Sequence, residues 1–342
     1  MPRVAVIEGD GIGPEVTEAA LRVLAHVCSM YGIDDLEIVK VPAGDNALKV
    51  YGSPLPEDSW KVITSVDAIL KGPVGETAGD VVVKIRRGLD LYANIRPSKC
   101  YPGVECLRPE IDLVVVRENT EDVYVRAEYL HGDVAIALRV ISARASERIA
   151  RVAFRIARQR RKKVTIVHKA NVMTVTDGLF RRKVLEVHDR EFPDVQVDEM
   201  YIDAAVMDIV RRPDRFDVIV TTNLFGDILT DLAAYVSGSI GLAASANIGD
   251  EKAMFEPVHG AAFDIAGKGI ANPTAMILCT AWMLKWLGEK YNNSRYIKAG
   301  EAIEKAVEKV LKEKRKLTPD LGGNATTLEM AEEIKNNIPL LS

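Results

Sequence analysis

Two aspartates, Asp227 and Asp231, are spaced for shared chemistry in the segment FDVIVTTNLFGDILTD. We expect a buried strand over 218–220, a break at Asn223 and Gly226, and a helix that begins at Asp227. Residues four apart lie on one face of a helix, where two like charges repel by a few tenths of a kcal/mol. A divalent cation bound by carboxylate oxygens would reverse that repulsion. The alternative is that Asp227 caps the helix while Asp231 is solvated.

Other ionisable side chains also follow predicted strands. Asp203 comes after a strand over 195–201, and Lys169 comes after a strand over 164–167. Ligands of open α/β sheets gather at the carboxyl ends of strands, so the three aspartates are candidates for one metal site. A lysine in such a place is either a proton-transfer group whose pKa burial lowers or a surface residue with a buried stem.

Three arginines near the ends of predicted elements have the chemistry of a carboxylate site. Arg86 lies in a predicted helix over 80–89, Arg96 lies in LYANIRPSK, and Arg117 ends a predicted strand over 111–116. Guanidinium groups bind carboxylates with two parallel hydrogen bonds. Each arginine alone is more simply a surface residue, so the argument depends on the three occurring together.

Two glycine-rich segments suggest close backbone approach to a ligand or a turn. GDGIGPE, residues 9–15, follows a buried strand over 4–8. Its spacing departs from the dinucleotide fingerprint, and Pro14 stands where the third glycine belongs, so we reject a Rossmann domain and expect a tight turn. Residues 237–275 read as a long loop, and a loop of this length is usually functional. Its ionisable side chains include Glu256, His259 and Asp264.

Composition and charge narrow the class of protein. The chain has 342 residues, 48% hydrophobic and 27% charged, which indicates a soluble globular protein of about two domains. A net charge of −4 gives no reason to expect nucleic acid or an anionic membrane as a partner. The four cysteines show neither metal spacing nor a disulfide pattern; they are Cys28, Cys100, Cys106 and Cys279. With no leader and no long apolar run, we expect a cytoplasmic location.

Strand and helix patterns alternate along the chain, which indicates an α/β fold. We expect further strands over 36–41, 66–71 and 133–142. The predicted helices cover 14–31, short segments near Asn46 and Pro56, and 146–160, 273–291, 298–314 and 328–336.

Six motifs, in this order along the whole chain, together resemble those of the β-hydroxyacid oxidative decarboxylases: GDGIGPE, LYANIRPSK, VRENTED, HKANVM, FGDILTD and FEPVHGAAFDIAGKGIANP. That family comprises 3-isopropylmalate, isocitrate, homoisocitrate and tartrate dehydrogenases. The resemblance implies a two-domain, non-Rossmann α/β fold of the isopropylmalate dehydrogenase kind. Its discontinuous first domain would comprise residues 1–97 and 239–342, the latter with the cofactor loop. The central domain, 98–238, would carry the dimer interface and the substrate and metal residues.

The resemblance also implies roles for single residues. The malate part of the substrate would be bound by Arg86, Arg96 and Arg117. The ligands of Mg²⁺ or Mn²⁺ would be Asp203, Asp227 and Asp231. Tyr124 and Lys169 would form the acid/base pair and also contact substrate. In this family Lys169, Asn171 and Asp203 enter the site from the partner subunit, which implies a homodimer with shared active sites.

The cofactor implied by the resemblance is NAD. The residues that would bind it are Glu256, His259, Gly260, Asp264, Ile265 and Asn272. NADP-dependent relatives resemble one another in placing a lysine and a tyrosine at the positions of Asp264 and Ile265. An acid at the first position can bind ribose hydroxyls and repels a 2′-phosphate, which favours NAD.

The residues before Arg86 indicate the substrate. Where isocitrate enzymes have polar residues for a third carboxylate, this chain has Asp80, which would repel that carboxylate, and Val82, which cannot bond it. Val83 stands where homoisocitrate enzymes can have an arginine. A valine-lined pocket suits an isopropyl group, since each buried methylene contributes about 0.8 kcal/mol. We therefore expect oxidative decarboxylation of 3-isopropylmalate to 2-oxoisocaproate, a step of leucine biosynthesis, with homoisocitrate or isocitrate as the alternative. Lys84 could serve a longer acid, or the valines could simply pack the helix.

Two other classes of function fit the sequence less well. A phosphoryl-transfer protein built around GDGIG would need GxxxxGK[ST], which is absent. A metal-dependent hydrolase would use the aspartates but leaves the glycine-rich segment around His259 unexplained.

Overall fold

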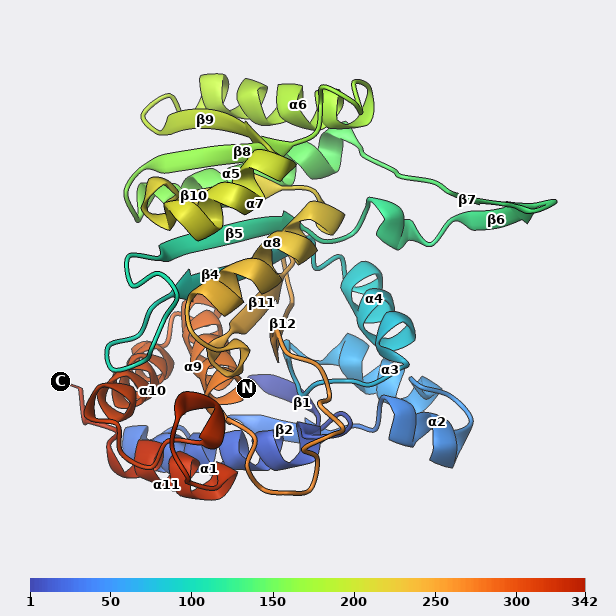
Figure 1. Ribbon diagram of the computed structural model, residues 1–342. Helices are drawn as coiled ribbons and strands as arrows, with labels where there is room; N and C mark the ends of the chain where they lie inside the picture. The colour runs from blue at the N-terminus through green and yellow to red at the C-terminus, as the bar shows by residue number, and fades with distance from the viewer. Residues whose placement is uncertain (342) are drawn as a thin grey trace.

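The computed structural model describes residues 1–341 and is built on one ten-stranded sheet (Figure 1). At one end, β1 (Arg3–Ile7), β2 (Glu37–Lys40), β3 (Ala68–Lys71) and β12 (Ala253–Pro257) are parallel. At the other end, β5 (Asp112–Glu118), β10 (Val218–Thr221), β8 (Lys163–His168) and β9 (Gln196–Tyr201) are parallel. Antiparallel β11 (Ala244–Ile248) and β4 (Ala93–Lys99) join the two groups, so the groups run in opposite directions.

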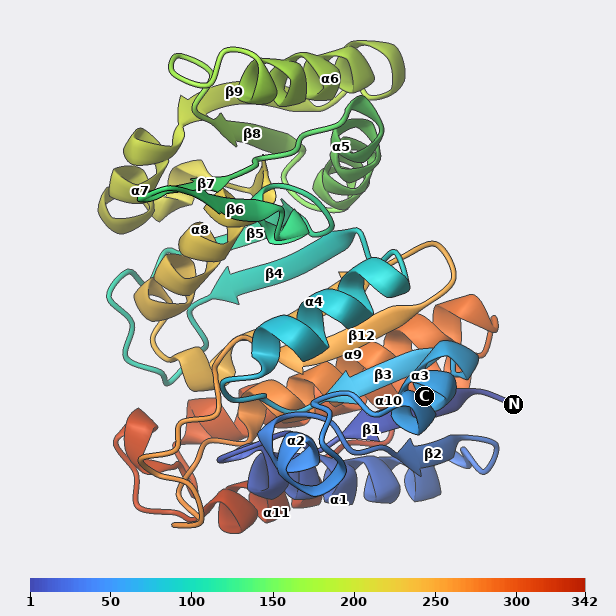
Figure 2. The same ribbon diagram turned by 90° about the vertical axis from the view of Figure 1, so that its right-hand side faces the viewer.

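Helices cover the two ends of the sheet separately (Figures 1 and 2). Near β1 to β3 lie α1 (Gly13–Tyr31), α2 (Asp45–Tyr51), α3 (Glu57–Ser65), α4 (Ala78–Gly88), α9 (Thr274–Lys290), α10 (Ser294–Glu313) and α11 (Thr327–Asn336). Near β8 to β10 lie α5 (Ala143–Arg158), α6 (Thr176–Glu191), α7 (Ile202–Arg211) and α8 (Asn223–Val236). Most strands and helices expected from the sequence are confirmed within a few residues at each end.

The hydrophobic core is divided in the same way. Two buried clusters, which we call the terminal cores, contain only residues from 4–91 and 242–338. Two others, the central cores, contain residues from 93–236. Buried apolar surface is the main source of stability, so each end of the molecule has its own stabilising core. The domain limits 1–97, 98–238 and 239–342 remain predictions.

A two-stranded arm, β6 (Glu128–His131) and β7 (Val134–Ala137), projects from the body of the molecule (Figure 1). The strand predicted over 133–142 is therefore shorter than expected, and it pairs with β6 rather than with the main sheet. Tyr129, Leu130 and Val134 are each more than half exposed. Isolated hairpins are marginally stable in water, so the arm has little in this chain to hold it in place.

Three expectations about local structure are wrong. Helix α8 begins at Asn223 and not at Asp227, so Asp227 lies beyond the cap position. Gly226 does not break the helix; a Cβ there would lie 2.5 Å from Cγ of Arg117, so glycine allows close packing. The long loop expected over 237–275 contains β11 and β12, and LYANIRPSK contains β4. Their alanines, asparagines and prolines hid these strands, because such residues have low β propensity.

The expectation of no disulfide is also wrong, because Cys100 and Cys106 are bonded. Gly103, at φ 91°, turns the short loop between them, which brings their Cα atoms to 6.0 Å. The cytoplasmic location remains a prediction. Within residues 1–341 no helix has both the length and the apolar character that crossing a membrane requires.

Candidate active site

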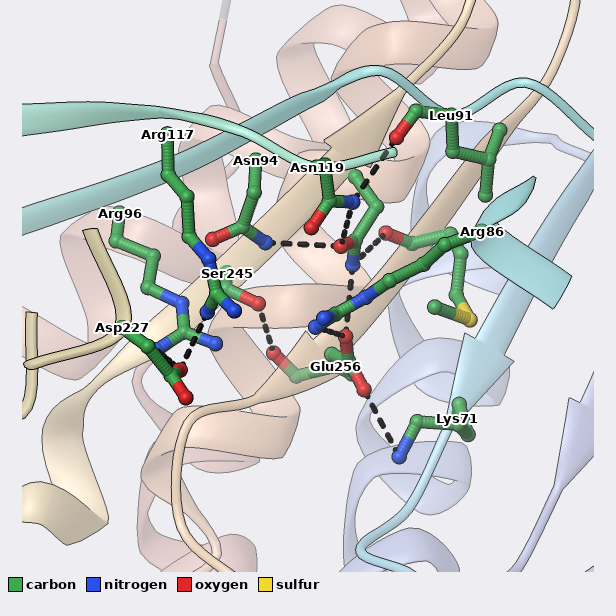
Figure 3. A network of polar contacts seen from close by, with 12 residues as sticks. Lys71, Arg86, Leu91, Asn94, Arg96, Arg117, Asn119, Asp227, Ser245 and Glu256 are labelled. Carbon is green, nitrogen blue, oxygen red and sulfur yellow. Dashed lines mark hydrogen bonds and ion pairs between the residues drawn. The ribbon is translucent and has the colours of Figure 1, made fainter. Parts of the chain in front are cut away.

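The three arginines predicted to bind carboxylates lie together with Asp227 of α8 (Figure 3). Arg96 Nη1 is 3.7 Å from Asp227 Oδ1 and 3.5 Å from Asp231 Oδ1. Arg117, inside β5 rather than after it, forms an ion pair with Asp227. Arg86 comes from α4, and its Nη2 lies 2.8 Å from the Glu256 carboxylate. The structure therefore assembles side chains from α4, β4, β5, α8 and β12.

The arginines are buried but not fully paired. The exposed fraction is 7% for Arg86, 6% for Arg96 and 1% for Arg117. Each keeps one buried nitrogen without a partner in residues 1–341: Arg86 Nε, Arg96 Nε and Arg117 Nη2. Burial, together with neighbouring Arg117 and Arg86, lowers the pKa of Arg96 to about 10. Buried polar groups normally have partners, so these free N–H groups indicate a site for an anion.

Tyr124, in the short 3-10 helix η1 (Val123–Val125), reaches the same cluster. Its hydroxyl donates to Asp227 Oδ2 at 2.6 Å, and the Arg117 guanidinium lies 5.1 Å from the ring centroid. Burial raises the pKa of Tyr124, the positive charge of Arg117 lowers it, and the hydrogen bond to Asp227 raises it again. The net result is a pKa of about 12. The phenol therefore keeps its proton at neutral pH.

The pKa values of Asp227 and Asp231 shift in opposite directions although the two residues share one helix face. Burial raises the pKa of Asp227, but Arg117, Tyr124 and Arg96 outweigh it and hold that pKa below its usual range. Burial dominates at Asp231 and raises its pKa despite Arg96. Two carboxylates and no sulfur or imidazole are a donor set that suits Mg²⁺ or Mn²⁺. In residues 1–341, however, no three acidic, histidine or cysteine side chains are grouped as metal ligands.

The third predicted ligand, Asp203, lies elsewhere. It begins α7 after β9 and forms an ion pair with Lys169, which follows β8. Because β8 separates β9 from β10, the ends of β9 and β10 are roughly 10 Å apart. Asp203 and the neighbouring Asn171 are exposed. A single chain therefore does not complete the predicted metal site or bring Lys169 to Tyr124.

A buried network that the sequence analysis missed connects α4 to the sheet (Figure 3). Lys71, at the end of β3, lies 2.9 Å from Glu256 Oε2, and Asn247 donates to Glu256 Oε1 at 2.8 Å. Burial would raise the pKa of Glu256, but Lys71 and Arg86 lower it far more. The available signal in the sequence for this network was Lys71, a lysine at the end of an otherwise apolar strand. Glu256 is thus engaged with Arg86, and its cofactor role remains a prediction.

The other predicted cofactor residues follow β12. His259 Nδ1 donates to the Gly260 carbonyl at 3.1 Å, and its buried Nε2 has no partner in residues 1–341. Burial lowers the pKa of His259, so the imidazole is neutral near pH 7. Asp264 is exposed, whereas Ile265 packs against a terminal core. Asn272 is already engaged, since it donates to Asp320 and accepts from Thr274 N.

Helix α4 carries the residues predicted to recognise the substrate. Val82 packs partly against a terminal core, whereas Val83 is half-buried and belongs to none of the cores. Lys84 lies over the ring of Trp60, 5.4 Å from its centroid. Asp80, which was expected to repel a third carboxylate, forms an exposed ion pair with Arg126 at 2.6 Å. The apolar argument therefore depends on Val83 more than on Asp80.

Comparisons with known proteins agree with this geometry. Residues 3–334 match the family described as isocitrate/isopropylmalate dehydrogenase. A 3-isopropylmalate dehydrogenase of Sulfurisphaera tokodaii is 53% identical over 336 residues, 98% of each chain. An isocitrate/homoisocitrate dehydrogenase of Thermus thermophilus is 52% identical over 339 residues, 97% of each chain. The crystal structure of isocitrate dehydrogenase from Methylococcus capsulatus superposes with a TM-score of 0.91 at 42% identity, covering 99% of both chains.

These likenesses extend over nearly the whole of each chain and confirm the predicted fold class. The relatives are dehydrogenases, so this protein is an enzyme of the same kind. The two relatives differ in the substrates that their names give, although their identities differ by one percentage point. The chain belongs to the isocitrate/isopropylmalate dehydrogenase family.

Proposed function

We propose that this enzyme catalyses the NAD- and divalent-metal-dependent oxidative decarboxylation of 3-isopropylmalate to 2-oxoisocaproate, a step of leucine biosynthesis. The observation that carries the proposal is the group of three buried arginines, each with an unpartnered N–H, beside the two carboxylates of α8. Such a site binds a small acid with more than one carboxylate. The name of the Sulfurisphaera tokodaii relative supports the substrate.

The residues of the chain would divide the reaction between them. Arg86, Arg96 and Arg117 hold the carboxylates of the malate part, using the N–H groups that are free here. Lys169, in its neutral form, takes the proton of the substrate hydroxyl as the alcohol is oxidised. After CO₂ leaves with its bonding electrons remaining on carbon, Tyr124 donates its proton to that carbon.

Two bound groups would supply the remaining chemistry. NAD⁺ would supply a hydride acceptor for the oxidation. Asp227 and Asp231 with Asp203 would hold Mg²⁺ or Mn²⁺, which would supply Lewis acidity. The oxygen-only donor set fits this ion, and neutral His259 with its free Nε2 fits a cofactor site.

We also propose a homodimer in which the partner subunit supplies Lys169, Asn171 and Asp203. Two observations support it. Those side chains lie apart from the arginine cluster within one chain, which leaves the site incomplete. In addition, α7, α8 and the arm expose large apolar side chains, each more than half accessible: Tyr129, Leu130, Met207, Ile228 and Tyr235. Large exposed apolar side chains are commonly covered at subunit interfaces.

The choice of acid depends on the substrate's distinguishing group. Val83 is available to an isopropyl group, and Lys84 is turned toward Trp60 rather than toward a third carboxylate. A carboxylate placed there without a partner would cost several kcal/mol. Homoisocitrate and isocitrate are the alternative substrates, and the name of the Thermus thermophilus relative favours them.

The deciding experiment measures kcat/KM with NAD⁺ and Mg²⁺ for 3-isopropylmalate, isocitrate, homoisocitrate, malate and tartrate. We expect 3-isopropylmalate to be preferred by at least tenfold. A tenfold preference for either tricarboxylate would refute the pocket argument and leave only the family assignment. Absence of NADH formation with every acid would refute the proposed reaction itself.

The cofactor preference is tested separately. Asp264 is exposed and free to bind ribose hydroxyls, and it repels a 2′-phosphate. We expect kcat/KM with NAD⁺ to exceed that with NADP⁺, and Asp264→Lys with Ile265→Tyr to shift the preference toward NADP⁺. Comparable values for the two cofactors in the wild-type enzyme would contradict the assignment.

A further inference from the structure

The aspartate of GDGIGPE, Asp10, is a buried carboxylate that no step of the proposed reaction uses. It is only 1% exposed. Its oxygens accept hydrogen bonds from the backbone N–H groups of Asp45 at 2.9 Å, Asn46 at 3.0 Å and Gly75 at 3.1 Å. Asp45 and Asn46 are the first residues of α2, whereas Gly75 lies just before α4. Asp10 therefore ties the turn after β1 to two other segments.

A second carboxylate continues this connection. Asp45, held by Asp10, accepts from Glu76 N at 3.0 Å, from Thr77 N at 2.9 Å and from Thr77 Oγ1 at 2.8 Å. Thr77 is the N-cap residue of α4, and its own side chain makes no capping bond. Three consecutive N–H groups before α4 thus point at two carboxylates. Carboxylates that accept backbone N–H bonds near a helix N-terminus stabilise it and fix its direction.

Two glycines show how closely the segments approach. A Cβ on Gly44, whose φ is 101°, would lie 2.2 Å from Asp10 Oδ2. A Cβ on Gly75 would lie 2.1 Å from Asp45 Oδ2 and 2.8 Å from the ring of Phe263 in the cofactor segment. Any side chain at either position would displace a carboxylate. The contacts are therefore specific and leave little room for alternatives.

We infer that Asp10 and Asp45 are positioning residues, which hold α4 so that Val83 meets the distinguishing group of the substrate. The inference rests on the proposed function, because it is α4 that carries Val83 and Arg86 toward the substrate. Arg86 is anchored independently through Glu256 near the C-terminal end of the helix. The two aspartates anchor the other end of α4. Losing them would affect recognition of the distinguishing group more than binding of the malate part.

The test compares two substrates in matched variants. Asp45→Asn keeps the size of the side chain, but its amide NH₂ would face the backbone N–H of Glu76 or Thr77, so that two donors oppose each other. We expect the ratio of kcat/KM for 3-isopropylmalate to that for malate, which lacks the isopropyl group, to fall about tenfold. The loss should appear in KM for 3-isopropylmalate, with kcat changed less than about threefold. If malate turns over too slowly, its inhibition constant replaces its kcat/KM.

Milder variants cover the case in which Asp45→Asn does not fold. Thr77→Val removes one donor to Asp45 with little change of volume, whereas Thr77→Ser retains the hydroxyl. We expect Thr77→Val to lower the selectivity ratio and Thr77→Ser to restore it. Asp58→Asn is the control, because Asp58 is an exposed acid in the first turn of α3 that pairs with Lys61. It should leave the ratio unchanged.

The outcomes separate this inference from the proposed function. A wild-type enzyme that prefers another acid refutes the proposed substrate only, and the ratio is then measured for that acid against malate. Unchanged ratios in both Asp45→Asn and Thr77→Val, in a wild-type enzyme that does discriminate, overturn the positioning role. Equal losses of kcat/KM for both substrates also overturn it, because they indicate general damage. A wild-type enzyme without dehydrogenase activity refutes both proposals.

Discussion

The inner cluster of Arg86, Arg96, Arg117, Tyr124 and Asp227 contrasts with the outer pair of Lys169 and Asp203. The inner side chains come from five elements. Asp227 contacts Arg96, Arg117 and Tyr124, and Arg86 lies nearby, where it pairs with Glu256 (Figure 3). The outer two contact each other beyond the ends of β8 and β9, and Asp203 is 60% exposed. One chain thus assembles the arginine cluster, which we propose binds the substrate carboxylates, whereas Lys169, the proposed proton acceptor, lies outside it. If both roles hold, binding and turnover have different structural requirements.

The difference follows from the sheet order. β4 and β5 are interior strands, so their side chains are fixed by neighbours on both sides. β9 is an edge strand, and residues beyond its end have a neighbour on one side only. Groups at such an edge can reach another subunit.

Metal removal should have the largest effect. We expect EDTA to abolish turnover and Mg²⁺ or Mn²⁺ to restore it. Asp227→Asn should lower kcat at least about 100-fold and more than Asp231→Asn, because Asp227 also pairs with Arg117 and Tyr124. Steady-state NADH formation measures both. Full activity in metal-free buffer would show that Asp227 serves only the arginines and Tyr124 of the inner cluster.

A mixed dimer tests whether the two regions come from different subunits. Lys169→Met should fold normally but lower kcat about 100-fold or more, the usual effect of losing a proton-transfer group. Mixed with an Asp227→Asn chain after reversible denaturation, it should recover about a quarter of wild-type activity. Half of the dimers would then be mixed, each with one intact site.

The matched control mixes two defects in the same region. Lys169→Met with Asp203→Asn should not recover activity, because every shared site would receive one altered outer residue. If the first mixture fails to recover although mixed dimers are shown by mass spectrometry, each site is formed within one chain.

Acid stability should show the smallest difference between the regions. The pKa of Asp227 lies below its usual range, so its contribution to stability is complete above about pH 4 and is lost as the pH falls through the folded pKa. Asp227→Asn should therefore lower Tm at pH 7 by on the order of 3–5 °C, and this difference should shrink toward pH 3. Asp203→Asn, at an exposed pair, should change Tm little at either pH. Equal changes of Tm for Asp227→Asn and Asp203→Asn would show that the two regions do not differ in acid stability.

The sequence identified ionisable side chains of the candidate site better than it located them in the fold. The spacing of Asp227 and Asp231 and the three arginines led to residues that the structure brings together. Placing Asp203 with them failed for one chain, because a strand pattern does not reveal that β8 lies between β9 and β10. The role of Lys71 was missed because a lysine at the end of an apolar strand does not reveal its buried partner, Glu256. The Cys100–Cys106 bond depends on a turn whose geometry the spacing alone does not show.

The exposed arm of β6 and β7 has a further consequence for how the enzyme behaves in solution. In the proposed dimer a partner would cover it, and association would follow mass action. Activity per mole of chain would then depend on the total enzyme concentration and fall by half near the dissociation constant of the dimer. On dilution each chain would keep its arginines and its affinity for the acid, yet it would lose turnover and expose the arm to proteases.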